Sequence, residues 1–147
     1  MRNSTLHDQD FHAWANEQAA LLRAGKLAQA DIEHIAEEIE SMGKTEQREL
    51  VSRLTVLLLH LLKWRYQPGR RGTSWEVSIA TQRRALGRHL RDNPSLKAKL
   101  PEAIEDAYID ARAFAYDETG LPRETFPVRC PWSFERMMAE DHWPEEG

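Results

Sequence analysis

Apolar residues recur along most of the chain at intervals of three, four and seven positions, which is the period of an amphipathic helix. Almost no stretch alternates apolar and polar residues in the way that a half-buried strand does. The pattern therefore predicts an all-α fold. We expect a single-domain helical bundle of about five helices, with a core from about residue 8 to residue 143, then a proline-rich C-terminal segment that wraps the bundle and a short terminal helix.

Two predicted helices near the N-terminus each end at a glycine, which tolerates the left-handed conformation found just past helix ends. Asp8 or Asp10 can cap the first helix, and Gly25 should end it. Asp31 can cap the second helix, and Gly43 should end it. The positions expected to lie on one side and face the core are Phe11, Trp14, Ala15, Gln18 and Leu22 in the first helix, and Ile32, Ile35, Ala36, Ile39 and Met42 in the second.

A third helix, from Thr45 to about Tyr66, should be the central one. Its apolar positions cover about half of the helix or more, which is wider than a surface helix needs. Pro68 and Gly69 should end it. The apolar positions are Leu50, Val51, Leu54, Leu58, Leu61 and Leu62.

A fourth helix, capped by Thr73 or Ser74, should present two different faces. Its outer face carries Arg84, Arg88 and Arg91 in an i, i+4, i+7 row, which we call the arginine row. The inward positions are Trp75, Ile79, Gln82, Leu86 and Leu90.

The last long helix should have Pro101 at its first position, because proline inside a helix removes a hydrogen bond and clashes with the preceding turn. Its expected inward positions are Leu100, Ile104, Ala107, Ala111 and Phe114. Pro122, Pro127 and Pro131 then predict an extended segment, and Ser133 can cap the short terminal helix. The long helix also carries Glu102, Asp106 and Asp110 in an i, i+4, i+8 row, which we call the acidic row and which could pair with the arginine row across a helix–helix groove.

Length and composition agree with one compact domain. A chain of 147 residues is long enough to fold without stabilisation by disulfides or metal ions, and the single Cys130 cannot form an internal disulfide. The most apolar stretch, Leu54 to Leu62, is far shorter than the roughly 20 residues that span a bilayer, and no apolar leader segment is present. We therefore expect a cytoplasmic protein that does not enter a membrane.

Charge is segregated along the chain. Residues 63–91 carry eight Lys and Arg against a single Glu, whereas the segments on both sides are acidic. This layout favours ion pairing within the chain or with a partner protein. Nucleic-acid binding through Arg70, Arg71, Arg83, Arg84, Arg88 and Arg91, with flanking aromatic residues that stack on bases, is the alternative.

Candidate binding residues cluster around the end of the third helix and the loop that follows it. On a helical wheel His60 lies on the mostly polar side of that helix, away from Leu58 and Leu62. Trp64 and Trp75 bracket the loop; they are either part of the core or walls of a groove. The predicted binding surface consists of Arg53, His60, Trp64, Gln67, Arg70, Arg71, Trp75, Arg84 and Arg88.

The residues with metal-binding chemistry give a weaker pattern. His34 lies within one helical turn of Asp31, Glu37 and Glu38, a spacing that can hold a metal ion, but the neighbouring Ile35 should turn this face outward. A solvated acidic face is the interpretation we favour, and we predict no metal site and no cofactor. Cys130 has no base nearby in the sequence, so we expect a structural thiol and no catalytic residue.

Four segments, taken in order, resemble one known family: "DFHAWANEQAALLRAGK", "DIEHIAEEIESMGKTEQREL", "LLLHLLKWRYQPGRRGTSW" and "ETGLPRETFPVRCPWSFERMM". They are similar to the bacterial helical proteins catalogued as domain of unknown function twenty-nine. The resemblance covers about Asp8 to Trp143 and implies an all-helical domain of bacterial origin. It implies no activity, so no functional residue follows from it.

Three functions are compatible with these patterns. We expect a non-catalytic protein-interaction or regulatory module, which binds a protein partner or forms a homo-oligomer, because the charge is segregated and no catalytic motif is present in the sequence. A nucleic-acid-binding protein that uses residues 63–91 is the alternative. A metal-assisted enzyme that uses His34 and His60 is the third and least favoured hypothesis.

Overall fold

The computed structural model describes residues 2–145, and side chains from residue 6 onward. Within this range the regular structure is entirely helical, which confirms the predicted all-α fold class. The chain divides into two compact units, residues 1–45 and 46–147. Two compact units can belong to one domain or to two, so the predicted single domain remains a prediction. The α-helices are α1 (Arg2–Gln9), α2 (Phe11–Arg23), α3 (Ile32–Tyr66), α4 (Thr73–Asp92), α5 (Leu100–Thr119) and α6 (Phe134–Met138).

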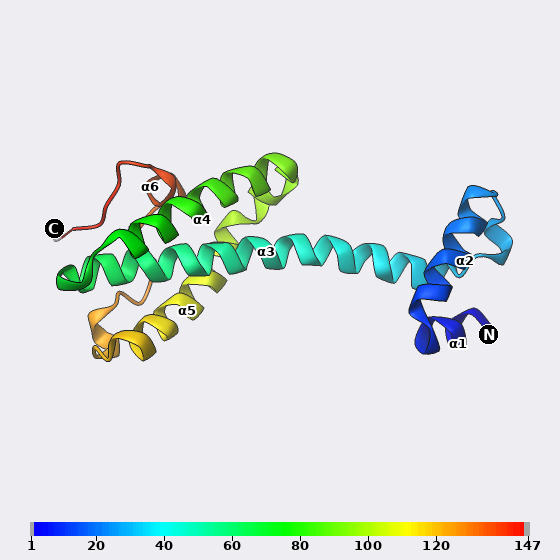
Figure 1. The fold of residues 1–147 in the computed structure, drawn as a ribbon, viewed down its shortest axis with the longest axis horizontal. Coiled ribbons are helices and arrows are strands. Elements are labelled where there is room, and N and C mark those ends of the chain that lie inside the picture. Colours follow the sequence, from blue (N-terminus) through cyan, green and yellow to red (C-terminus); the bar gives the residue numbers. More distant parts are fainter. Residues whose placement is uncertain (1, 146–147) are drawn as a thin grey trace. The chain divides into compact units, whose positions relative to one another are not determined.

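The first unit contains α1, α2 and the beginning of α3 (Figure 1). The side chain of Asp10 caps α2 by accepting a hydrogen bond from the backbone N–H of Ala13, 3.0 Å away. Just past the end of α2, Gly25 has a φ of 73°, in the left-handed region that the sequence pattern anticipated. The α1 helix was not among the predicted elements.

The predicted break at Gly43 is wrong, because α3 is continuous from Ile32 to Tyr66. One glycine inside a helix costs only about 1 kcal/mol relative to alanine, and good helix formers surround this one. The expected burial of the apolar stripe before Gly43 is wrong as well. Ile32, Ile39 and Met42 are all exposed; we call these three residues the exposed apolar stripe.

The second unit is built around the remainder of α3, with α4 and α5 on opposite sides of it (Figure 1). The central position predicted for this helix is confirmed, since its leucines are almost completely buried. Ile79, Leu86 and Leu90 of α4 pack into the same core. The buried α3 residues of this core are Leu50, Leu54, Leu57, Leu58, Leu59, Leu61, Leu62 and Trp64.

Two details of α4 and α5 differ from the prediction. Gly72 precedes the first turn of α4, so neither Thr73 nor Ser74 caps it through a side chain. In α5 Ala103, Ala107, Ala111 and Ala115 are buried, whereas Phe114 is 49% exposed. Pro101 is tolerated in the first turn of α5, where its missing N–H has no partner to lose.

The C-terminal segment wraps the second unit as predicted. The Tyr108 hydroxyl of α5 donates a hydrogen bond to the carbonyl of Pro127 (2.6 Å), and Arg112 donates to the carbonyls of Phe126 and Arg123. Ser133 caps α6 by accepting from the N–H of Arg136, which confirms that prediction. No helix in the described part of the chain is long and apolar enough to cross a membrane.

The predicted pairing of the arginine row with the acidic row is absent among the described residues. All six side chains are exposed, and the ion pairs found within residues 6–145 do not join them. Lys63 pairs instead with Glu118, at 2.7 Å. The arginine row therefore faces solvent.

Candidate functional site

Of the predicted surface residues on α3, Arg53 and His60 make local contacts. The guanidinium of Arg53 lies 3.4 Å from both a Glu49 carboxylate oxygen on the same helix and the side-chain oxygen of Gln82 on α4. The Nδ1 of His60 is 2.8 Å from the carbonyl oxygen of Val56, one turn earlier. An imidazole N–H donated to its own helix leaves one ring nitrogen for any other contact.

Arg71 holds the loop after α3 in place through hydrogen bonds to two backbone carbonyls. Its Nε donates to the carbonyl of Trp64 at 2.7 Å, and a terminal nitrogen donates to the carbonyl of Pro144 at 3.3 Å. The guanidinium also lies over the Trp64 ring, which packs against Trp143 with the ring centroids 4.6 Å apart. The predicted residues Trp64 and Arg71 therefore do meet, but they join the loop to the C-terminal segment.

The other predicted surface residues are more open. Trp75 is half-buried against the core, with the Lys63 ammonium 5.3 Å from its ring centroid, and Gln67 is half-buried beside the loop. Arg70 and Arg88 are exposed. Arg84 lines an open hollow of about 350 Å³, together with Ala80, Arg83, Met138, Glu140 and Trp143.

Arg83 is not available to nucleic acid, which corrects its place in the predicted basic set. It is buried, and it donates hydrogen bonds to the carbonyls of Met137 (2.7 Å) and His142 (2.8 Å). Burial lowers the pKa of its guanidinium, while the nearby acids of the C-terminal segment oppose that shift. The helical pattern indicates this burial, since residue 83 falls four positions after Ile79 on the inward side of α4.

A separate group of titratable side chains lies in the first unit. His7 and Asp8 come from α1, Asp31 from the position before α3, and His34 and Glu38 from its first two turns. We call these five residues the histidine–carboxylate cluster. The Nε2 of His7 is 2.8 Å from Glu38, and the Nδ1 of His34 is 2.7 Å from Asp31. The two imidazole rings stack with centroids 4.1 Å apart and planes 15° apart.

Aromatic side chains of α2 enclose one side of this cluster. Trp14 is 3% exposed; its ring meets His7 edge-on at 4.5 Å, and its Nε1 donates to Asp31 at 3.0 Å. Phe11 lies 5.4 Å from His7. The cluster is therefore partly shielded from water, which strengthens the electrostatic interactions inside it.

Neighbouring groups shift the pKa values of two cluster members. The hydrogen bond to Glu38 is the main reason why the pKa of His7 is raised. Desolvation opposes this shift, and the hydrogen bond to Asp8 adds a smaller increase. For Asp31, desolvation is the largest single influence and raises the pKa. The hydrogen bonds from His34 and Trp14 outweigh it together, so the pKa of this carboxyl is lowered.

The sequence located only part of the cluster. It placed His34 beside Asp31, which the structure confirms, but Glu37 is exposed and Glu38 binds His7 instead of His34. His7 was missed because its contact with Glu38 joins residues 31 positions apart, and no local pattern encodes such a contact. The least favoured hypothesis, metal chemistry that uses His34 and His60, gains no support, since the candidate ligands grouped with His34 are His7 and Asp8.

Comparison with known proteins gives a family and no activity. No curated protein and no solved structure matches the chain. The family model that describes a domain of unknown function, DUF29, matches residues 6–143, which is nearly the whole chain and contains both the loop after α3 and the histidine–carboxylate cluster. On this match the chain belongs to the DUF29 family.

Proposed function

We propose that the chain is a protein-interaction module whose first unit binds a basic amphipathic helix of a partner protein. The observation that carries this proposal is the exposed apolar stripe of α3, in which Ile32 is 54%, Ile39 63% and Met42 69% exposed. Removing such surface from water is worth about 25 cal/mol per Å². An apolar stripe along a helix is a typical docking surface for another helix.

Charge on the same turns of α3 favours a basic partner. Glu33, Glu37 and Glu40 are exposed and follow one another at i, i+4 and i+7. At 100° per residue they lie on a different side of the helix from the stripe, and Glu40 is the nearest, about 80° from Ile32. They add negative potential near the stripe, which attracts a partner helix that carries lysines or arginines. Two copies of this helix would repel each other, so the charge favours a different protein over a second copy.

A designed pair of labelled peptides tests this proposal. Both peptides carry the same leucine stripe on an alanine-rich helix; one has lysines beside the stripe and the other has glutamates. Fluorescence anisotropy should show that the full-length protein binds the lysine peptide, in the affinity range of a small transient interface, and binds the glutamate peptide at least about tenfold more weakly.

Matched variants locate the binding face. Ile39→Asp together with Met42→Asp should abolish binding of the lysine peptide. Ile109→Asp, which changes a similarly exposed residue of α5, should leave binding unchanged. Equal binding of both peptides, or binding that survives the double substitution, contradicts the proposal.

The arginine row supports nucleic-acid binding as a second candidate function. Arg84, Arg88 and Arg91 are exposed at helical spacing and have no acidic partner among the ion pairs of the described residues. A row of this kind can follow a phosphate backbone. Anisotropy with labelled duplex and single-stranded oligonucleotides at low salt tests it. Binding should weaken steeply as salt rises and should be lost in Arg84→Glu/Arg88→Glu; no binding at low salt excludes this candidate.

A further inference from the structure

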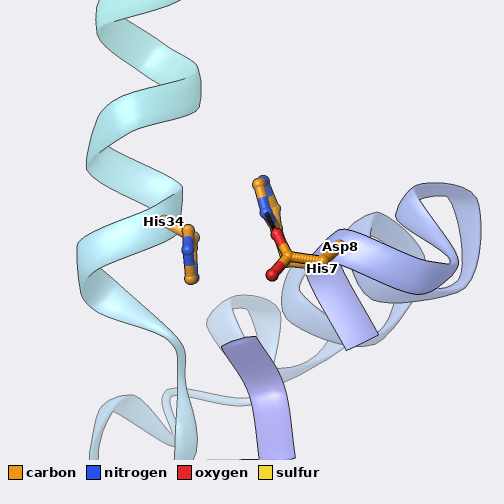
Figure 2. A group of neighbouring side chains, drawn as sticks. All are labelled: His7, Asp8 and His34. Atoms are coloured by element: carbon orange, nitrogen blue, oxygen red, sulfur yellow. Dashed lines mark hydrogen bonds and ion pairs between the residues drawn. The ribbon is translucent and has the colours of Figure 1, made fainter. Parts of the chain in front are cut away.

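The ligand atoms of three residues in the histidine–carboxylate cluster converge. One atom each from His7, Asp8 and His34 lies within 4.8 Å of the other two. Figure 2 shows the imidazoles of His7 on α1 and His34 on α3 facing each other, with the Asp8 carboxylate beside His7. All three residues belong to the first unit. Two imidazoles and one carboxylate are a common donor set for a transition-metal ion.

The neighbouring carboxylates arrange the two rings for metal binding. Asp31 accepts a hydrogen bond from Nδ1 of His34, and Glu38 accepts one from Nε2 of His7. In a neutral imidazole the proton then sits on the bonded nitrogen, so Nε2 of His34 and Nδ1 of His7 keep their lone pairs. Asp8 lies on the side of the free nitrogen of His7, with Oδ1 3.5 Å from Nδ1. Metal-ligating histidines are usually held by a carboxylate in this way.

Charge and surroundings also favour a cation at this position. Asp8, Asp31 and Glu38 place three carboxylates in contact with the two imidazoles. Trp14 and Phe11 line one side with aromatic rings, and this reduces access of water. A bound cation would be attracted by the carboxylates, and these residues include no lysine or arginine that would repel it.

We propose that His7, Asp8 and His34 bind a divalent transition-metal ion of the zinc class. A metal ion lies in the plane of each imidazole that ligates it, so binding turns the two rings out of their 4.1 Å stack. Solvent completes the coordination, because the protein supplies three ligands. The ion then cross-links α1 to α3. This proposal does not depend on the protein-interaction role, since the exposed apolar stripe supplies none of the ligands.

Titration of the full chain, purified without an affinity tag and freed of metal by a chelator, tests the site. Isothermal calorimetry with Zn²⁺ should give one equivalent bound, and Co²⁺ should give visible d–d absorption typical of nitrogen and oxygen ligands. His7→Gln and His34→Gln should each lower the affinity for Zn²⁺ by at least about tenfold. Asp31→Asn, which neutralises the acceptor that orients His34 and also receives the Trp14 N–H, should lower it by about 10–100-fold.

Two further histidines provide matched controls. His12 contacts Asn16 on α2, and His60 contacts the carbonyl of Val56, so neither takes part in the cluster. His12→Gln and His60→Gln should bind Zn²⁺ as the unmodified chain does. Far-ultraviolet circular dichroism in chelator verifies that every variant is folded. The proposal is overturned if the unmodified chain binds no Zn²⁺, or if folded His7→Gln/His34→Gln binds it equally well.

Discussion

The two units of the chain are stabilised by different kinds of contact. In the described part of the first unit, the buried side chains are Trp14 and Gln18. The second unit buries a continuous core of leucines, alanines and aromatic residues. Hydrophobic burial is spread over many contacts and is insensitive to direction. A core of this kind makes the second unit the stable part of the molecule.

The first unit depends on a few directional contacts that meet at Asp31. Its carboxylate accepts hydrogen bonds from Trp14 and His34, and its backbone N–H donates to the side chain of Gln18 at 2.7 Å. Several of these groups titrate. The difference between the units indicates that stability and ligand binding are separated along this chain: the proposed metal ion and partner helix would act on the first unit, and the core of the second unit holds the fold.

Truncating the leucine core should have the largest effect on stability. Leu58→Ala removes a side chain that is 0% exposed and leaves a cavity, so we expect the free energy of unfolding to fall by about 2–5 kcal/mol. Ile39→Ala, at a position that is 63% exposed, should change it by less than about 0.5 kcal/mol. Urea unfolding followed by circular dichroism measures both. Similar losses in the two variants would show that the exposed stripe is buried in solution.

Replacing the buried arginine of α4 should have the next largest effect on stability. Arg83→Met removes two hydrogen bonds and leaves the carbonyls of Met137 and His142 without their donor, so we expect a loss of about 2–3 kcal/mol. Its neighbour Arg84 is exposed, and Arg84→Met should change stability by less than about 0.5 kcal/mol. Urea unfolding gives the energies, and hydrogen exchange should show that residues 134–145 lose protection. Unchanged protection there contradicts the role of Arg83 in holding the C-terminal segment.

Local patterns predicted the second unit better than the first. Helical periodicity identified the buried leucines around Leu58, and capping rules identified Ser133 and Asp10, because these features depend on neighbours in the sequence. Periodicity also assigned Ile39 to a core, since an apolar stripe looks the same whether or not another element covers it. Burial of such a stripe depends on tertiary packing, which the pattern does not contain.

The candidate sites show the same limit. The contact of His34 with Asp31 follows from a spacing of three residues, whereas the approach of His7 requires α1 to fold back beside α3. The buried role of Arg83 follows from its place in the helical period, but its acceptors are carbonyls more than fifty residues away. Chemistry that joins distant segments therefore had to come from the structure.

Neutralising Asp31 should weaken the first unit alone. Asp31→Asn removes the charge from the acceptor of the Trp14 and His34 hydrogen bonds, which should cost about 1–2 kcal/mol of local stability. Hydrogen exchange should show faster opening of α2 and of the first turns of α3, with unchanged protection around Leu58. Asp10→Asn is the matched control, because asparagine caps a helix as well as aspartate does. Equal loss of protection in both units would mean that they unfold together.

The smallest effect, and the one that separates the units most directly, is the response to pH. The pKa of His7 is raised, mainly by Glu38, so its contribution to stability is present below its ordinary value of 6.5 and is lost as the pH rises through the folded pKa. The pKa of His142 is lowered by burial and then by Arg136 and Arg83, so protonation opposes folding and stability falls as the pH drops below 6.5.

Nuclear magnetic resonance titration of the imidazole protons measures both groups in one experiment. We expect the pKa of His7 above 6.5 and that of His142 below it, with α1 and α2 losing protection at high pH and the C-terminal segment losing it at low pH. Glu38→Gln should bring the pKa of His7 down and leave His142 unchanged, because the two histidines lie in different units. Shifts of both histidines in the same direction would show that one field acts on the whole chain and that the two units do not respond separately.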